Sequence, residues 1–133
     1  MIKVDVRPTA FLHSPKHVYV IQFDNAMVKI GITRSIKHRV GQLVKQFGGK
    51  YKITKLFYTE KIYEALDVER TIKECLSKDY QPCYGTECFL VQYEEVLGLM
   101  REINLWHFAF FVESQDIIAR YFTHTNADNR KEN

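Results

Sequence analysis

Two short runs of β-forming residues joined by a tight turn constrain this chain most strongly. His17–Phe23 and Met27–Thr33 are rich in β-branched and aromatic residues, and Asp24-Asn25-Ala26 lies between them as a turn sequence. The pattern predicts an antiparallel β-hairpin near the start of the chain.

Helical and extended segments follow the hairpin. Apolar residues recur at the helical period across 36–47, with Ser35 as a candidate N-cap and Gly48-Gly49 as a stop signal. Residues 51–58 predict a third strand beside the hairpin, and residues 87–91 could add an extra edge strand. The expected fold class is therefore α+β, with a small antiparallel three-stranded sheet flanked by helices.

A second helix is predicted over 60–77, with Thr59 as its N-cap, and it carries two charges in its apolar stripe. On a helical projection at about 100° per residue, Glu69 and Lys73 both fall in the middle of this stripe. An unpaired carboxylate there is costly, because taking a charge out of water costs several kcal/mol. Glu69 therefore either pairs with Lys73 or faces a cleft where its oxygens bind a divalent cation.

The rest of the chain gives weaker signals. A third helix is predicted from Tyr93 to Ile103, and the aromatic segment 105–122 fits either a helix or a strand followed by a helix. With 133 residues, the chain suits a single domain. We expect a core at about 17–103, an aromatic extension at about 104–122 and a polar tail at 123–133.

Composition excludes several classes of protein. Hydrophobic residues make up 46% and charged residues 26%, an average balance that argues against disorder and against a coiled coil. No apolar run approaches the roughly 18 residues of a membrane span, and the first ten residues lack the apolar core of a signal peptide. Three cysteines without a CxxC pair favour neither disulfides nor a standard zinc site. A cytoplasmic protein without membrane partners is expected.

Charge is divided unevenly along the chain. Residues 1–58 hold 11 Lys and Arg against two Asp, whereas residues 59–133 hold 8 against 14 Asp and Glu. A basic region attracts polyanions, because Lys and Arg displace the counterions of a phosphate backbone; an ordinary solvated surface is the alternative. The candidate phosphate contacts near the first helix and the sheet edge are Arg34, Lys37, His38, Lys45, Lys50 and Lys52.

Arg39 lies just outside the apolar stripe of the first helix. Considered alone, such an arginine lays its stem on the core and extends its charged head into water. Arg39 is also part of a longer linear pattern, which suggests a functional role for it. The pattern consists of Val18-Tyr19-Val20, then Lys29-Ile30-Gly31, then Arg39, then Glu69, and finally Gly85-Thr86-Glu87-Cys88-Phe89.

In order and spacing, this pattern resembles the GIY-YIG nuclease superfamily, and most closely its phage-type branch with a KIG core. The resemblance implies metal-dependent hydrolysis of DNA phosphodiester bonds. It implies that Arg39 neutralises the phosphoryl oxygens and that Glu69 binds one Mg²⁺ or Mn²⁺ that stabilises the leaving oxygen. Tyr19 would position or deprotonate the attacking water, while Lys29 either assists as a neighbouring cation or is itself the base.

The chain also departs from the family pattern. The first tripeptide lacks its glycine, Leu43 stands where the superfamily has a histidine, and Lys73 stands where this branch often has one. Lys73 could neutralise Glu69 and compete with the metal. The alternative function is therefore a DNA-binding module with weak or no turnover, in which 105–122 could form a homodimer interface. Contacts to phosphates predict weak sequence preference and strong salt dependence in either case.

Overall fold

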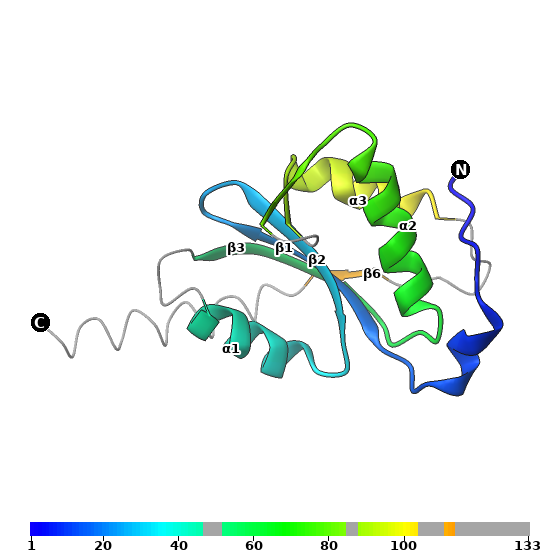
Figure 1. The fold of residues 1–133 in the computed structure, drawn as a ribbon. Coiled ribbons are helices and arrows are strands. Elements are labelled where there is room, and N and C mark those ends of the chain that lie inside the picture. The colour runs from blue at the N-terminus through cyan, green and yellow to red at the C-terminus, as the bar shows by residue number, and fades with distance from the viewer. Residues whose placement is uncertain (47–51, 85–87, 104–110, 114–133) are drawn as a thin grey trace, which may run out of the picture.

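The computed structural model describes residues 1–46, 52–84, 88–103 and 111–113, which form an antiparallel sheet between helices (Figure 1). The strand order is β4-β5-β2-β1-β3-β6. In chain order, the elements are a 3₁₀ helix η1 (Pro8–Leu12), β1 (His17–Phe23), β2 (Met27–Thr33), α1 (Ile36–Gln46), β3 (Ile53–Thr59), α2 (Ala65–Ser77), β4 (Pro82–Tyr84), β5 (Cys88–Leu90), α3 (Tyr93–Arg101) and β6 (Phe111–Glu113). The predicted α+β class is confirmed, and the arrangement is consistent with a GIY-YIG-like fold.

The central strand β1 is buried on both faces of the sheet. It pairs antiparallel with β2 on one side and with β3 on the other. Figure 1 shows α1 on one side of the sheet and α2 and α3 on the opposite side. The side chains of β1 alternate accordingly: Tyr19, Ile21 and Phe23 pack toward α1, whereas Val18 and Val20 pack toward α2 and α3. One strand thus supplies residues to both faces.

The first helix begins where the sequence predicts, because its predicted cap is formed. The Ser35 hydroxyl accepts a hydrogen bond from the His38 backbone N–H at 3.3 Å, which satisfies a backbone donor of the first turn. Ile36, Val40 and Leu43 are the buried residues of α1 and form its core-facing stripe. The predicted stop at Gly48-Gly49 lies outside the described residues.

The second helix begins at Ala65, so the prediction that it starts near 60 with Thr59 as N-cap is wrong. Thr59 instead ends β3, where its hydroxyl accepts a hydrogen bond from the Val18 N–H at 3.0 Å. The same hydroxyl donates to the Glu60 carbonyl at 2.7 Å. These contacts hold the Thr59 hydroxyl in the sheet, and the chain stays non-helical until α2 begins.

The buried stripe of α2 is also rotated relative to the prediction. Val68, Ile72 and Leu76 are fully or almost fully buried, whereas Leu66, predicted to lie in the stripe, is 54% exposed. Glu69 and Lys73 therefore lie at the margin of the apolar face rather than in its middle.

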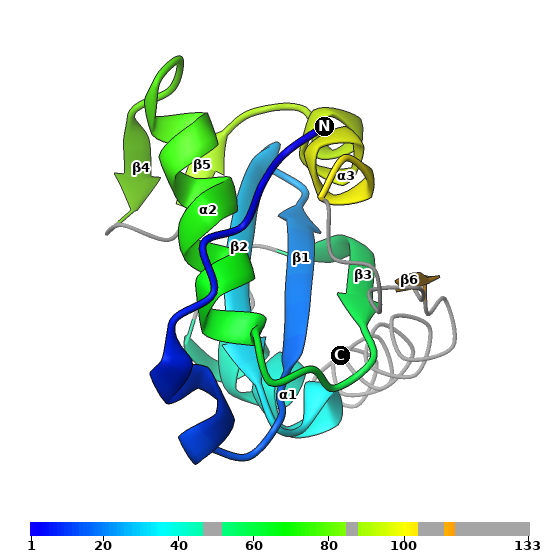
Figure 2. The same cartoon turned by 90° about the vertical axis from the view of Figure 1, so that its right-hand side faces the viewer.

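The N-terminal segment accounts for a buried carboxylate that the sequence pattern did not reveal. This segment runs along α2 (Figure 2), and it covers Asp67, which is 2% exposed. Asp67 Oδ1 pairs with Arg70 Nη1 at 3.0 Å, and Oδ2 accepts a hydrogen bond from the Arg7 N–H at 3.4 Å. Arg70 Nη2 also donates to the Asp5 carbonyl at 2.8 Å. A pair of charges on α2 thus anchors the start of the chain.

The sheet is wider than the three strands predicted. β5 lies within the predicted extra strand 87–91, and β4 pairs outside it, while β6 pairs with β3 at the opposite edge. Most of 105–122 and all of 123–133 lie outside the described residues, so the division into core, extension and tail stays a prediction. None of the helices in the described part of the chain is both long and apolar enough to cross a membrane.

Candidate functional site

Tyr19 and Arg39 meet between the sheet and α1. Tyr19 is 1% exposed, and its Oη accepts a hydrogen bond from Arg39 Nε at 3.1 Å. Arg39 is half-buried near the start of α1, and its Nη1 donates to Gln42 Oε1 at 3.3 Å. Two residues from different elements thus place a permanent positive charge beside a phenol oxygen.

Gly31 makes room for the ring of Tyr19. The two residues are directly opposite each other in the β1–β2 register. A Cβ built on Gly31 would lie 2.5 Å from Tyr19 Cζ and 2.8 Å from Cε1, closer than nonbonded carbon atoms approach. Any side chain at this position would displace the ring and, with it, the contact to Arg39.

Lys29 lies on the same face of the sheet. It is opposite Ile21 in β1 and opposite Cys88 in β5, and both of these residues pack toward α1. Residues opposite each other share a face, so Lys29 is a diagonal neighbour of Tyr19, a relation with a typical Cα separation of roughly 7–8 Å. Its side chain is mostly buried, at 5% exposure.

The predicted phosphate contacts lie on the outer surface of α1 and just before it. α1 contains no acidic residue, so the charged side chains on this surface are all basic. The exposed residues are Arg34, Lys37, His38 and Lys45, together with Lys52 before β3. Lys50 lies outside the described residues.

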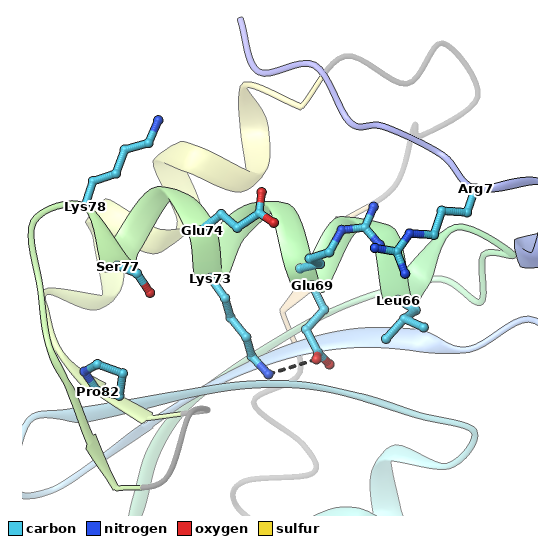
Figure 3. A pocket seen from close by; sticks show the side chains of 9 residues that line it. Arg7, Leu66, Glu69, Lys73, Glu74, Ser77, Lys78 and Pro82 are labelled. Carbon is cyan, nitrogen blue, oxygen red and sulfur yellow. Dashed lines mark hydrogen bonds and ion pairs between the residues drawn. The ribbon is translucent and has the colours of Figure 1, made fainter.

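Glu69 belongs to the opposite side of the sheet. Its Oε1 accepts a hydrogen bond from Lys73 Nζ at 2.8 Å, and the two side chains are 12% and 18% exposed. Figure 3 shows both side chains pointing from α2 toward the strands. The ion pair that the sequence offered as one explanation of Glu69 is therefore present.

Glu69 and Lys73 line a cavity of about 610 Å³ along α2 that extends to β4 (Figure 3). Tyr19, Lys29 and Arg39 do not line it. The remaining lining residues are Arg7, Leu66, Arg70, Glu74, Ser77, Lys78 and Pro82. The structure thus brings three of the four predicted catalytic residues to the α1 face and places Glu69 at a cavity of α2.

The edge of β2 lies between these two parts. β5 pairs with β2 only at Met27, Val28 and Lys29. Within the described residues, no strand covers that side of β2 beyond Lys29, and Gly31 lies in this uncovered part. A ligand that follows this edge would have the Tyr19–Arg39 pair on one side and the cavity of α2 on the other.

The side chains around Glu69 suit a Mg²⁺ site with one protein carboxylate rather than a site with several protein ligands. In the part of the chain that the structure describes, no group of three or more His, Cys, Asp and Glu side chains could hold a metal ion. Mg²⁺ needs no such cage, because it commonly binds one or two carboxylates and retains several waters. Glu69, at the wall of a wide cavity, fits this donor set, although Lys73 already contacts one of its oxygens.

Two contributions to these sites escaped the sequence analysis. The steric role of Gly31 had a signal, because a glycine inside a strand pattern often marks a close approach of another group. The Asp67–Arg70 pair had none, because the backbone that it binds lies 60 and 65 residues away in the sequence.

Comparison with known families adds one finding. Residues 16–104, which include Tyr19, Lys29, Arg39 and Glu69, match the T5orf172 domain. This domain is phage-associated and occurs in nuclease contexts, which indicates a nuclease-like or DNA-binding module. Comparisons with curated proteins and with solved structures give no match. Because the matched segment spans more than half of its length, the chain belongs to the T5orf172 domain family.

Proposed function

We propose that this protein is an endonuclease that hydrolyses DNA phosphodiester bonds with the aid of one divalent cation. The observation that carries the proposal is the 3.1 Å contact between Arg39 Nε and Tyr19 Oη, formed over Gly31. Such a pair combines a group that binds phosphate oxygens with a hydroxyl that can take part in proton transfer. Membership of the T5orf172 family supports the same class of function.

The residues of the α1 face would have different roles in hydrolysis. Arg39 would neutralise the charge that grows on the phosphoryl oxygens as water attacks phosphorus. Tyr19, whose Oη accepts a hydrogen bond from Arg39 Nε, would position the attacking water. The water oxygen bonds to phosphorus while the bond to the leaving sugar oxygen breaks. The water proton passes to a base, either Tyr19 as its phenolate or Lys29 as its neutral amine, and the leaving sugar oxygen takes up a proton from solvent.

Glu69 would hold the cation, with water and phosphate oxygens as the other ligands. When bound, the cation supplies Lewis-acid stabilisation of the leaving oxygen. A DNA strand that passes Gly31 at the edge of β2, where no described strand pairs with it, would contact Arg39 on one side and reach the Glu69 cavity on the other. The basic surface of α1 would hold neighbouring phosphates, which favours weak sequence preference and strong salt dependence.

Cleavage of supercoiled plasmid with Mg²⁺, Mn²⁺ or EDTA tests the proposal. The full chain should cut only with metal, and Arg39→Ala and Glu69→Gln should each abolish cutting while circular dichroism stays unchanged. Arg101→Ala is the matched control, since it removes an exposed arginine at the end of α3, on the other side of the sheet from Tyr19, and should retain cutting. Cutting that persists in EDTA, or in both variants, would show the proposal to be wrong.

A DNA-binding module without turnover is the second candidate, and the Lys73–Glu69 contact favours it. A lysine ammonium at 2.8 Å already neutralises the carboxylate that the cation needs. In this case the full chain binds plasmid under every metal condition and never cuts it. A homodimer formed through 105–122 stays a prediction, which sedimentation at several protein concentrations would test.

A further inference from the structure

Exposed apolar side chains gather at one place on the described surface. Four of the six exposed large hydrophobic residues belong to η1 or to the start of α2 and the turn before it, and we call these four the Phe11 surface. Its members are Phe11, Leu12, Tyr63 and Leu66. Phe11 is 61% exposed and Tyr63 48% exposed, and their ring centroids lie 5.8 Å apart. The two rings therefore leave a large aromatic area open to solvent.

The Phe11 surface has a basic border. A cavity of about 100 Å³ beside the rings is lined by Tyr63 and Leu66 and by three basic residues, Arg7, His13 and Lys16. Asp67 is the acidic residue of this lining, and its charge is already matched by Arg70 at 3.0 Å. Aromatic rings with a positive border suit a ligand with both a flat apolar face and negative charge.

The Phe11 surface also adjoins the cavity that contains Glu69. Arg7 and Leu66 line both the 100 Å³ cavity and the 610 Å³ cavity along α2. Leu66 lies about one helical turn before Glu69 on α2. A chain-like ligand could therefore place one unit on the rings of Phe11 and Tyr63 while its next units follow α2 toward Glu69.

We propose that the Phe11 surface stacks an unpaired base of the DNA substrate, so that the protein acts on single-stranded or branched DNA. Base–aromatic stacking tolerates any sequence, because every base has a π face. In an intact duplex these faces are covered by neighbouring base pairs, so only unpaired bases can use the rings. The inference rests on the proposed function for its DNA substrate, and it adds the structural class of that DNA.

Binding in EDTA tests the inference without any cleavage. Affinity would be measured by fluorescence anisotropy for a labelled dT strand of about a dozen nucleotides, and for a fully paired linear duplex without a loop. Phe11→Ala and Tyr63→Ala should each weaken single-strand binding roughly tenfold and leave duplex binding unchanged. Tyr63→Phe should keep full affinity, because the ring is retained. Leu90→Ala, at a 60% exposed apolar residue of β5, is the control and should change neither affinity.

Three results would overturn the inference. The first is unchanged single-strand affinity in both alanine variants, and the second is an equal loss for strand and duplex. The third is loss of self-association in Phe11→Ala during sedimentation with single-strand affinity retained, which would make this surface a protein interface. Single-strand binding without cutting would count against the nuclease proposal alone, whereas metal-dependent cutting without the selective loss would count against this inference alone.

Discussion

The two sides of the sheet hold their polar residues together in different ways. On the α1 face, Tyr19 and Arg39 come from different elements, and they meet only when β1, β2 and α1 are packed. On the α2 side, Glu69 and Lys73 are four residues apart on one helix, so their contact needs little beyond that helix. Substitutions that disturb the packing of the α1 face should therefore change fold and function together, whereas substitutions at the α2 pair leave the rest of the packing in place.

Of the substitutions considered, Gly31→Ala should lower stability and cleavage most, because the new methyl group would overlap the Tyr19 ring. We expect a loss of about 1–3 kcal/mol in the free energy of unfolding, the usual cost of overpacking, together with loss of cleavage. Urea denaturation followed by circular dichroism measures the first effect. Gly98→Ala is the matched control, since its Cβ would have nothing within 4 Å and should stabilise α3 by up to about 1 kcal/mol. Equal stability of the two variants would contradict the account of Gly31.

Tyr19→Phe should separate the chemistry of the α1 face from its packing. The ring remains over Gly31, so the unfolding free energy should fall by only about 1 kcal/mol for the lost hydrogen bond. Cleavage should fall by at least about 100-fold, the usual size of a proton-transfer contribution. Tyr58→Phe removes the hydroxyl of the residue opposite Tyr19 in β3 and serves as control in a single-turnover assay. If both variants cut alike, Tyr19 has no special role.

Local sequence signals predicted the parts of the fold that depend on neighbouring residues. The hairpin, α1 and its Ser35 cap follow from such signals, as does the position of Arg39 beside the buried stripe. The start of α2 does not, because the Thr59 hydroxyl bonds to Val18, 41 residues away. The rotation of the α2 stripe could not be predicted either. Leu66 and Val68 are both apolar, so the pattern alone does not say that Val68 faces the core and Leu66 faces solvent.

The candidate site, too, could be predicted from the sequence only in part. The spacing of Tyr19, Lys29 and Arg39 placed these residues in adjacent elements, and the structure puts all three on one face. The separation of Glu69 from them could not be read from spacing, because it depends on which face of the sheet α2 covers. The catalytic roles of all four residues stay predictions.

Lys73→Met tests whether the lysine on the α2 side competes with a cation for Glu69. Removing the ammonium beside Glu69 should raise Mn²⁺ affinity up to about fivefold. The cost in stability should be confined to the mostly buried carboxylate that is left without its partner. An electron paramagnetic resonance titration of free Mn²⁺ measures this without DNA. Lys78→Met, in the same cavity, controls for general charge. An equal gain in both variants would show that Lys73 does not compete specifically.

Lys45→Ala should have the smallest effect. If Lys45 contacts a phosphate, its removal should lower the slope of log K against log salt by about one unit for every DNA sequence tested. Lys55→Ala, which removes a lysine paired with Glu94 at 2.8 Å, is the control. An unchanged slope for Lys45→Ala would remove the outer surface of α1 from the DNA interface.

A double-mutant cycle on Tyr19 and Arg39 tests most directly whether these two residues act as one unit. Cleavage rate constants would be measured for the native chain, Tyr19→Phe, Arg39→Ala and the double variant, each with Mg²⁺ at saturating DNA. Because the side chains share one contact, we predict that the double variant is no slower than the slower single variant. Independent effects that multiply in the double variant would contradict the account.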